Sequence, residues 1–158
     1  MPDESEQAPD FTVPLANGDV ESFTLSDQLE EGPVVLAFFP GAFTAVCQTE
    51  LCTFQDQLGE FEAIGASVFG LSVDPPFAQN EFRDQNDLSF GLLSDSDKSV
   101  IDAYGVRATD FADLGYDASK RAVFVIDSDG TIVYSWVTDD PGVEPEYEAV
   151  AAAASDAA

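Results

Sequence analysis

Histidine is absent from this 158-residue chain, and cysteine occurs only twice. Without histidine the chain cannot form a Ser-His-Asp triad or a Cys-His pair, so enzymes that depend on either arrangement are excluded. The commonest protein ligand of zinc, copper and non-haem iron is missing as well. Two cysteines alone cannot complete a structural zinc site. We therefore expect no metal, and chemistry that relies on sulfur, hydroxyl, carboxylate or guanidinium groups.

Basic residues are scarce too. The chain has 31 acidic side chains against 5 basic ones, and its formal net charge is -26. Such a surface repels phosphate groups, so we expect no nucleic acid and no anionic membrane as a partner. The acidic residues are spread along the chain and do not form one tail. This pattern is typical of a halophilic protein, because concentrated salt screens the self-repulsion. An ordinary acidic protein is the alternative.

Long hydrophobic segments are also missing. The longest apolar stretch, residues 33–43, is far too short to span a bilayer, and the acidic start of the chain has no signal-peptide pattern. We therefore expect a soluble, cytoplasmic protein. With 45% hydrophobic residues, 13 phenylalanines among them, the chain can bury a core. Its length fits a single domain over residues 1–158, with a loose N-terminal arm over residues 1–9.

Two short apolar runs flank a helical pattern in the first half of the chain. Residues 33–39 and 66–73 are continuous apolar runs, typical of strands that are buried on both faces. Between them, apolar residues recur in steps of four and three, which predicts one amphipathic helix from Thr44 to near Gly65. Its apolar face would consist of Cys47, Leu51, Phe54, Leu58 and Phe61. Cys47 would then lie in the first turn of this helix, directly after a buried strand.

The rest of the chain continues the alternation of strands and helices. The other expected elements are a hairpin around residues 17–18, helices over 75–86, 98–104 and 144–154, a short strand over 90–95 and a hairpin over 121–137. Residues 106–119 have no regular pattern, and residues 144–158 form a C-terminal helix and tail. This order indicates an α/β sandwich in which helices flank a central mixed β-sheet.

The expected environment of Cys47 favours a reactive thiolate. Unpaired N–H groups and the positive end of the dipole surround the first turn of a helix, and both stabilise the thiolate, which is the nucleophilic form. Thr44 lies one turn earlier and could donate a hydrogen bond to the sulfur or to an oxygen beside it. Pro40 ends the strand, has no N–H and could shield the sulfur from water. Taken singly, these residues could equally be a small buried hydrophobe, a helix cap and a strand stop.

The pattern Pro40-x-x-x-Thr44-x-x-Cys47 resembles the active-site motif of peroxiredoxins, the alkyl hydroperoxide reductase and thiol-specific antioxidant family. The resemblance extends over most of the chain, because APDFTV, FFPGAFTAVCQTEL, SVDPPF, LLSDSDKSVIDAYGV and RAVFVIDSDGTIV are similar to family blocks and occur in the family's order. It implies a thioredoxin-like fold and a peroxidase that needs no metal, haem or flavin. The implied partners are hydrogen peroxide or an organic hydroperoxide, a thioredoxin-like or small-thiol reductant and, as in many members, a second copy of the chain in a homodimer.

The resemblance also implies a role for each residue of the motif. Cys47 would be the peroxidatic cysteine, which attacks the O–O bond and becomes a sulfenic acid. Thr44 would hold the peroxide oxygens, and Pro40 would shield the pocket. Arg121 matches the family's active-site arginine and would stabilise both the thiolate and the departing oxygen, although on its own it could be a surface ion-pair partner. Glu50 would give a supporting hydrogen bond to an arginine.

Cys52 follows Cys47 by five residues, a spacing that an intact helix cannot bridge with a disulfide. The two Cα atoms would be about 8.6 Å apart and the side chains about 140° apart around the axis, whereas a disulfide needs less than about 7 Å. The first turns of the helix must therefore unwind before the two sulfur atoms can meet. A resolving cysteine, which attacks the sulfenic acid after such unwinding, fits this spacing.

The family comparison leaves the role of Cys52 open. This Cys-x4-Cys arrangement resembles the bacterioferritin-comigratory branch, in which the second cysteine resolves the first as an intramolecular disulfide. The wider motif looks closer to the alkyl hydroperoxide reductase E-like branch, in which a resolver at this site is not the rule. One alternative is therefore a one-cysteine enzyme with Cys52 as a bystander. The others are a general thiol–disulfide oxidoreductase and a non-catalytic module that kept the scaffold.

Overall fold

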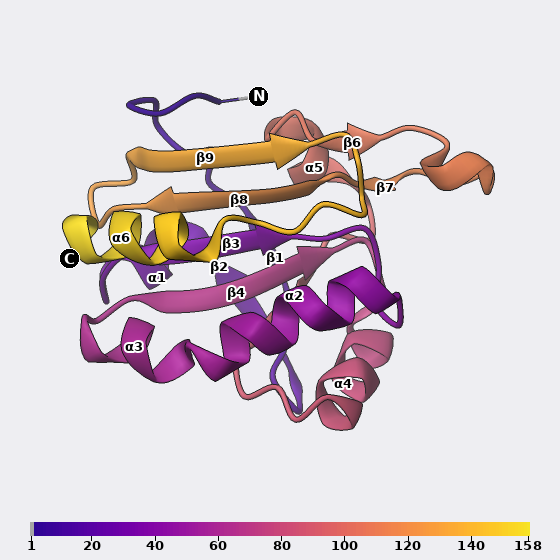
Figure 1. Ribbon diagram of the computed structural model, residues 1–158, viewed down its shortest axis with the longest axis horizontal. Coiled ribbons are helices and arrows are strands. Elements are labelled where there is room, and N and C mark those ends of the chain that lie inside the picture. The colour runs from indigo at the N-terminus through magenta and orange to yellow at the C-terminus, as the bar shows by residue number, and fades with distance from the viewer. Residues whose placement is uncertain (1) are drawn as a thin grey trace.

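The structure is a computed structural model that describes residues 2–158 (Figure 1). At its centre lies a seven-stranded mixed sheet in the order β2-β1-β5-β4-β3-β8-β9. These strands are β1 (Thr12–Ala16), β2 (Val20–Thr24), β3 (Val34–Phe38), β4 (Ser67–Ser72), β5 (Leu92–Ser94), β8 (Arg121–Ile126) and β9 (Ile132–Thr138). A two-stranded sheet joins β6 (Arg107–Ala108) to β7 (Ala118–Ser119). Both expected hairpins, β1–β2 and β8–β9, are confirmed as antiparallel pairs.

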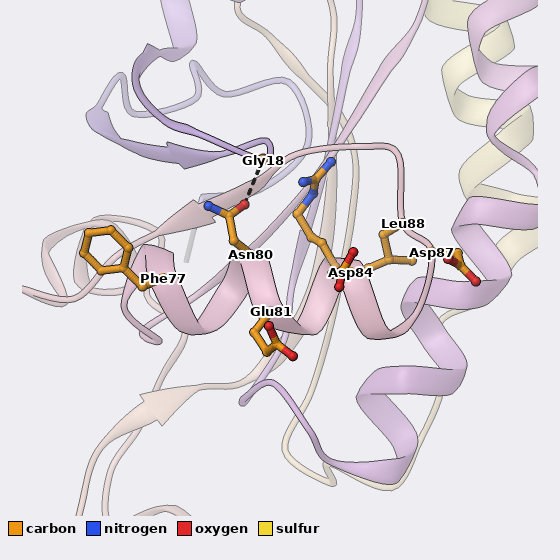
Figure 2. A pocket seen from close by; sticks show the side chains of 8 residues that line it. Gly18, Phe77, Asn80, Glu81, Asp84, Asp87 and Leu88 are labelled. Atoms are coloured by element: carbon orange, nitrogen blue, oxygen red, sulfur yellow. Dashed lines mark hydrogen bonds between the residues drawn. The ribbon is translucent and has the colours of Figure 1, made fainter.

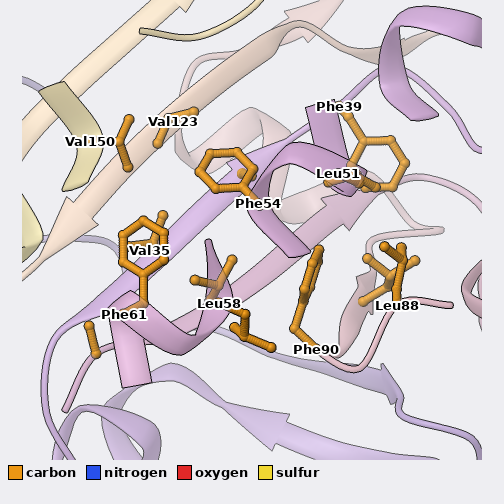
Figure 3. Close-up of a cluster of buried hydrophobic side chains, with 14 of the residues drawn as sticks. Val35, Phe39, Leu51, Phe54, Leu58, Phe61, Leu88, Phe90, Val123 and Val150 are labelled. Carbon is orange, nitrogen blue, oxygen red and sulfur yellow. The ribbon is translucent and has the colours of Figure 1, made fainter. Parts of the chain in front are cut away.

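Helices cover both faces of the central sheet (Figure 1). They are α1 (Leu25–Leu29), α2 (Ala45–Asp56), α3 (Leu58–Ala63), α4 (Pro76–Gln85), α5 (Ser99–Ala103) and α6 (Tyr147–Ala157), with a 3-10 turn over Phe111–Asp113. One hydrophobic core packs α2, α3, α4 and α6 against the sheet, and a second packs α1 and α5 against its other face. Figure 3 shows Leu51, Phe54, Phe61 and Val150 in the first core. The predicted α/β sandwich with a mixed sheet is confirmed.

Strand β3 is buried on both faces, as its continuous apolar run predicts. All five of its side chains are buried, and they alternate between the two cores. The strand pairs in parallel with β4 and antiparallel with β8. Phe38, the last residue of β3, lies opposite Ala122 of β8. The preceding residue of β8, Arg121, therefore lies beside the loop that leads from β3 into α2.

The helix predicted from Thr44 to near Gly65 is in fact two helices. α2 ends at Asp56 and α3 begins at Leu58, and the residue between them, Gln57, caps both. The N–H of Gln57 is shared between two carbonyl oxygens, those of residues 53 and 54, each at 3.2 Å, which marks a tightened last turn. Apolar side chains continue on one face across this break. Their spacing alone therefore could not show it.

The N-terminal arm, expected to be loose, is hydrogen-bonded to the start of β9. Ser5 donates its N–H to the carbonyl oxygen of Ile132 at 2.8 Å, and Ile132 donates to Glu6 at 2.9 Å. An isolated antiparallel bridge also joins Gln7 to Thr131. Main-chain pairing of this kind has no side-chain signature, which is why the polar sequence of the arm did not predict it. Within residues 2–158, no helix combines the length and apolar character needed to cross a membrane.

Candidate active site

Cys47, Glu50 and Arg121 form a buried polar cluster where β3 leads into α2. Arg121 donates from Nη2 to the sulfur of Cys47 at 3.2 Å and from Nη1 to Oε1 of Glu50 at 2.8 Å. Cys47 and Glu50 lie one turn apart on α2, whereas Arg121 is the first residue of β8. Their side chains are almost wholly inaccessible to solvent. The structure thus brings Arg121 into contact with two residues that lie more than 70 positions earlier in the sequence.

The start of α2 places Cys47 where the sequence analysis expects it. Cys47 is the third residue of the helix, after Ala45, so the unpaired N–H groups of the first turn lie around it. The preceding Phe43 has a left-handed backbone with a φ of 65°. Such a conformation is uncommon for a residue other than glycine and occurs often at functional sites. Here it turns the chain from the end of β3 into the helix.

Pro40 and Thr44 lie at the rim of the cluster. Together with Arg121 and four further residues they line a hollow of about 200 Å³ above the cluster. Thr44 is the N-cap of α2, but its hydroxyl donates to the carbonyl oxygen of Gly41 at 3.0 Å. The expected hydrogen bond from Thr44 to the sulfur of Cys47 is not formed. The hydroxyl donates to the carbonyl oxygen of Gly41 instead of to the sulfur.

The carbonyl oxygen of Pro141 also holds Arg121, and the sequence analysis missed this contact. It accepts hydrogen bonds from Nε at 3.2 Å and from Nη2 at 2.9 Å. A turn in which Asp140 accepts the N–H of Gly142 at 2.9 Å presents this carbonyl. Proline followed by glycine does indicate a turn. Nothing in the sequence, however, shows that the turn reaches an arginine twenty residues earlier in the chain.

Cys47 is covered by its neighbours, with no exposed area of its own. The hollow over Arg121 adjoins a second one of about 390 Å³, and the two share Pro40, Phe111, Arg121 and Pro141. Both hollows therefore lead toward the arginine, whose side chain is 1% exposed, and a movement of the rim would admit a small oxidant to the sulfur. The environment is not purely hydrocarbon, because a guanidinium group is in contact with the sulfur.

A larger hollow, of about 490 Å³, lies along α4 (Figure 2), and none of the cluster residues lines it. Its lining includes the exposed Phe77 and the carboxylates of Glu81, Asp84 and Asp87. It contains no cysteine and no residue of the motif. The smaller hollow over Arg121, where a thiol and a guanidinium group meet, is therefore the candidate site.

Burial and charge act in opposite directions on the ionisable groups of the cluster. Burial raises the pKa of Glu50 to about 8, although the neighbouring Arg121 opposes this rise. Burial alone would lower the pKa of Arg121, but the charges of Glu50 and Cys47 outweigh it and the pKa is raised. Arg121 therefore stays cationic in contact with the sulfur, whereas Glu50 holds its proton more tightly than an exposed glutamate does.

Cys52 lies on the same unbroken helix as Cys47, and both thiols are free. Its sulfur is partly buried and lies 3.9 Å from Oδ1 of Asn86. Burial raises the pKa of Cys52, and the carboxylates of Asp56 and Asp87 raise it further. Cys52 is therefore less readily ionised than an exposed cysteine, and no hydrogen bond within residues 2–158 joins its sulfur to a lysine or arginine. Of the two cysteines, only Cys47 has the surroundings of an attacking thiolate.

The fold is a mixed sheet between helices, and the site joins a cysteine in the first turn of a helix to an arginine from a neighbouring strand. Together they define a thioredoxin-fold thiol enzyme. The AhpC/TSA family profile matches residues 5–135. The chain belongs to this family, the peroxiredoxins, as the motif at Pro40, Thr44 and Cys47 predicts.

Individual relatives agree with this assignment. Peroxiredoxin Bcp of Escherichia coli K12 is 35% identical over 134 residues, which cover 84% of this chain and 83% of the relative. The chloroplastic 2-cysteine peroxiredoxin of Chattonella marina var. antiqua is 34% identical over 142 residues, covering 85% and 70%. The crystal structure of peroxidoxin BcpB from Mycobacterium tuberculosis has a TM-score of 0.82 at 32% identity and covers 95% and 94% of the two chains. The thioredoxin-like fold expected from the motif is confirmed.

Proposed function

We propose that the protein reduces hydroperoxides with Cys47 as the attacking thiolate. The contact of 3.2 Å between its sulfur and Nη2 of Arg121, beneath an accessible hollow, is the observation that carries the proposal. The thiolate attacks the terminal oxygen of the hydroperoxide, a new S–O bond forms and the O–O bond breaks. Cys47 becomes a sulfenic acid, and the departing alkoxide or hydroxide takes a proton and leaves as alcohol or water.

Arg121 stabilises two negative charges, that of the thiolate before the attack and that of the departing oxygen during it. Before the attack its guanidinium group balances the thiolate, and during the attack it lies close to the negative charge that develops on the departing oxygen. The carbonyl of Pro141 and the carboxyl of Glu50 fix its orientation. In this scheme Thr44 turns its hydroxyl from Gly41 toward the bound peroxide. The buried ring of Pro40 keeps bulk water from the sulfur.

We propose further that Cys52 resolves the sulfenic acid. Its thiol attacks the sulfur of Cys47, a disulfide forms, and the hydroxyl of the sulfenic acid leaves as water. A dithiol reductant, either a thioredoxin-like protein or a small thiol, then restores both thiols. Two observations support this order: Cys52 is partly accessible, and its raised pKa suits a thiol that acts second. A one-cysteine enzyme, in which an external thiol attacks Cys47 directly, is the alternative.

Intact-mass spectrometry after one equivalent of hydrogen peroxide tests both steps. The reduced parent should reach the mass of an intramolecular disulfide, and Cys52→Ser should gain a single oxygen atom. Cys47→Ser should stay unchanged, because Cys52 alone is poorly ionised. A parent that accumulates a sulfenic acid would contradict the resolving role of Cys52. A Cys47→Ser variant that consumes peroxide at the parental rate would overturn the whole proposal.

We propose that the protein works in the cytoplasm of a salt-rich cell. We propose also that it forms a homodimer. The net charge of -26 supports the first part, because high salt screens such a charge. Exposed apolar side chains near the hollow, Phe43, Leu114 and Tyr116, support the second, since a second copy of the chain would cover them. Light scattering at several protein concentrations in concentrated salt tests the dimer. A monomer mass throughout would rule it out.

A further inference from the structure

We propose that Glu50 sets the ionisation of Cys47, because the two acids compete for the single positive charge of Arg121. The inference deepens the role proposed for Cys47 and adds a second role to Glu50. Besides holding the arginine by a hydrogen bond, this glutamate decides how much of its charge is left for the sulfur. Glu50 is in this sense a positioning residue, since it acts on the thiol through Arg121.

The geometry of the cluster allows one compensated negative charge. Nη1 of Arg121 is used by Glu50, Nη2 by Cys47 and by the carbonyl of Pro141, and Nε by the same carbonyl. The arginine side chain is 1% exposed and that of Glu50 is 0% exposed. A thiolate and a carboxylate together would leave an excess negative charge in a site without water contact, which is strongly unfavourable. One of the two acids therefore keeps its proton.

An unpartnered oxygen indicates which acid stays protonated. Oε2 of Glu50 is buried and has no hydrogen-bond partner among residues 2–158, whereas Oε1 accepts from Arg121. In a carboxylate both oxygens carry charge, so an ionised Glu50 would leave half of that charge without a donor. A protonated carboxyl group leaves only a neutral O–H without an acceptor, which costs less than an uncompensated charge. Burial, which raises the pKa of Glu50 to about 8, acts in the same direction.

The other charged groups around Glu50 support the same assignment. Arg121 of β8 is the basic side chain in contact with it, with 2.8 Å between Nη1 and Oε1. From the segment before α6, the carboxylate of Glu144 raises the pKa of Glu50 further. Tyr147 of α6 lies on the same side and donates its hydroxyl to Glu144 at 2.8 Å. No contact among the described residues brings a second cation to Glu50, so the guanidinium group is the only charge to be shared.

The two groups must then titrate as a coupled pair. At neutral pH a protonated Glu50 leaves the charge of Arg121 to the thiolate. As the pH rises through the pKa of Glu50, a carboxylate forms and competes with the thiolate, so that complete ionisation of both requires a higher pH. In Glu50→Gln the amide oxygen can still accept the hydrogen bond from Nη1 but never carries charge. The thiolate then has the guanidinium to itself at every pH.

The rate of Cys47 alkylation by iodoacetamide as a function of pH tests this inference. The measurement uses Cys52→Ser as the parent, so that Cys47 is the only thiol. Addition of Glu50→Gln should leave the alkylation rate at neutral pH unchanged, because a neutral amide then replaces a carboxyl group that is already protonated. Glu60→Gln, which removes an exposed carboxylate of α3, is the matched control and should leave the profile unchanged. A clearly faster alkylation of folded Glu50→Gln at neutral pH would show that Glu50 is ionised in the parent, and would overturn the proposal.

A reciprocal measurement covers the case in which Glu50→Gln does not fold. Coupling between two sites is equal in both directions, so loss of the Cys47 thiolate must ease the ionisation of Glu50. In Cys47→Ser, carbon-detected NMR of labelled glutamate should show Glu50 titrating at lower pH than in the parent. The same pKa in both proteins would refute the coupling. Neither measurement uses peroxide, so a Cys52→Ser protein that fails to reduce peroxide would refute the proposed function alone.

Discussion

At the scale of single residues, the site depends on one guanidinium group that reaches three different acceptors. Arg121 contacts the sulfur of Cys47, the carboxyl of Glu50 and the carbonyl of Pro141. The planar fork of arginine suits this arrangement, because it offers donors in several fixed directions at once. Lysine could make one of these contacts but not all of them. The same residue therefore serves stability and chemistry.

Replacing Arg121 with Gln should affect both properties. We expect the reaction with peroxide to slow by a factor that corresponds to about 2–4 kcal/mol, the cost of losing one electrostatic stabiliser. The free energy of unfolding should fall as well, because Glu50 and Pro141 lose their buried partner. Stopped-flow kinetics and urea denaturation measure the two effects. An unchanged rate in a folded variant would show that the pocket is misplaced.

Thr44 offers a narrower test of the same pocket. Thr44→Val keeps the shape of the side chain and removes the hydroxyl, so the peroxide step should slow by a factor of similar size, about 2–4 kcal/mol. Thr49→Val is the matched control, since Thr49 lies on the same helix and its hydroxyl bonds only to the carbonyl of Ala45. Equal rates for the two variants would remove Thr44 from the mechanism.

At the scale of elements, the sequence predicts well what depends on side-chain spacing. The buried strand β3, the start of α2 and the late hairpin follow from apolar patterns, and the motif places Cys47 in the first turn. The family resemblance implied a hydrogen bond from Glu50 to an arginine, and the structure shows that this arginine is Arg121, 71 residues later in the chain. No local pattern could supply it.

What the sequence could not predict depends on the main chain. The break at Gln57, the pairing of the N-terminal arm with β9 and the carbonyl of Pro141 all involve backbone groups, which every residue carries. The hydroxyl of Thr44 is a different case. The sequence offered the sulfur of Cys47 as an acceptor, but in the structure the hydroxyl donates to the carbonyl of Gly41 at 3.0 Å. Sequence patterns do not rank such alternatives.

Oxidation should unwind the first turns of α2, because the intact helix keeps Cys47 and Cys52 on different sides. Hydrogen exchange of the amides in residues 45–52 should therefore accelerate in the oxidised parent, whereas the helix over residues 147–157 should keep its protection. Cys52→Ser, which cannot form the disulfide, should show no such loss after the same treatment. Full protection of α2 in an oxidised parent that contains the disulfide would contradict this prediction.

At the scale of the whole molecule, the distribution of charge dominates. The net charge of -26 results from 31 acidic residues against 5 basic ones, and one of these five, Arg121, is buried in contact with Cys47 and Glu50. The lysine and arginine pairs at the surface, such as Lys120 with Asp139, neutralise little of the rest. Self-repulsion should therefore oppose the folded state whenever salt does not screen it.

The free energy of unfolding should rise steeply as potassium chloride is increased from low to molar concentration. Screening shortens the range of the repulsion between carboxylates from about 30 Å at low salt to about 3 Å at molar salt. Chemical denaturation at a series of salt concentrations measures the effect, with sucrose at matched water activity as the control for excluded-solute effects. A chain that stays folded and active without molar salt would refute the halophilic interpretation.

The most direct test of the account asks which sulfur meets the oxidant first. Reduced Cys52→Ser and Cys47→Ser are each treated with one equivalent of hydrogen peroxide and a sulfenic-acid trap, and the labelled peptide is then located by mass spectrometry. We predict rapid labelling of Cys47 in the first variant, because Arg121 supports its thiolate, and no comparable labelling of Cys52 in the second. Faster labelling of Cys52, or no labelling of Cys47, would contradict the account.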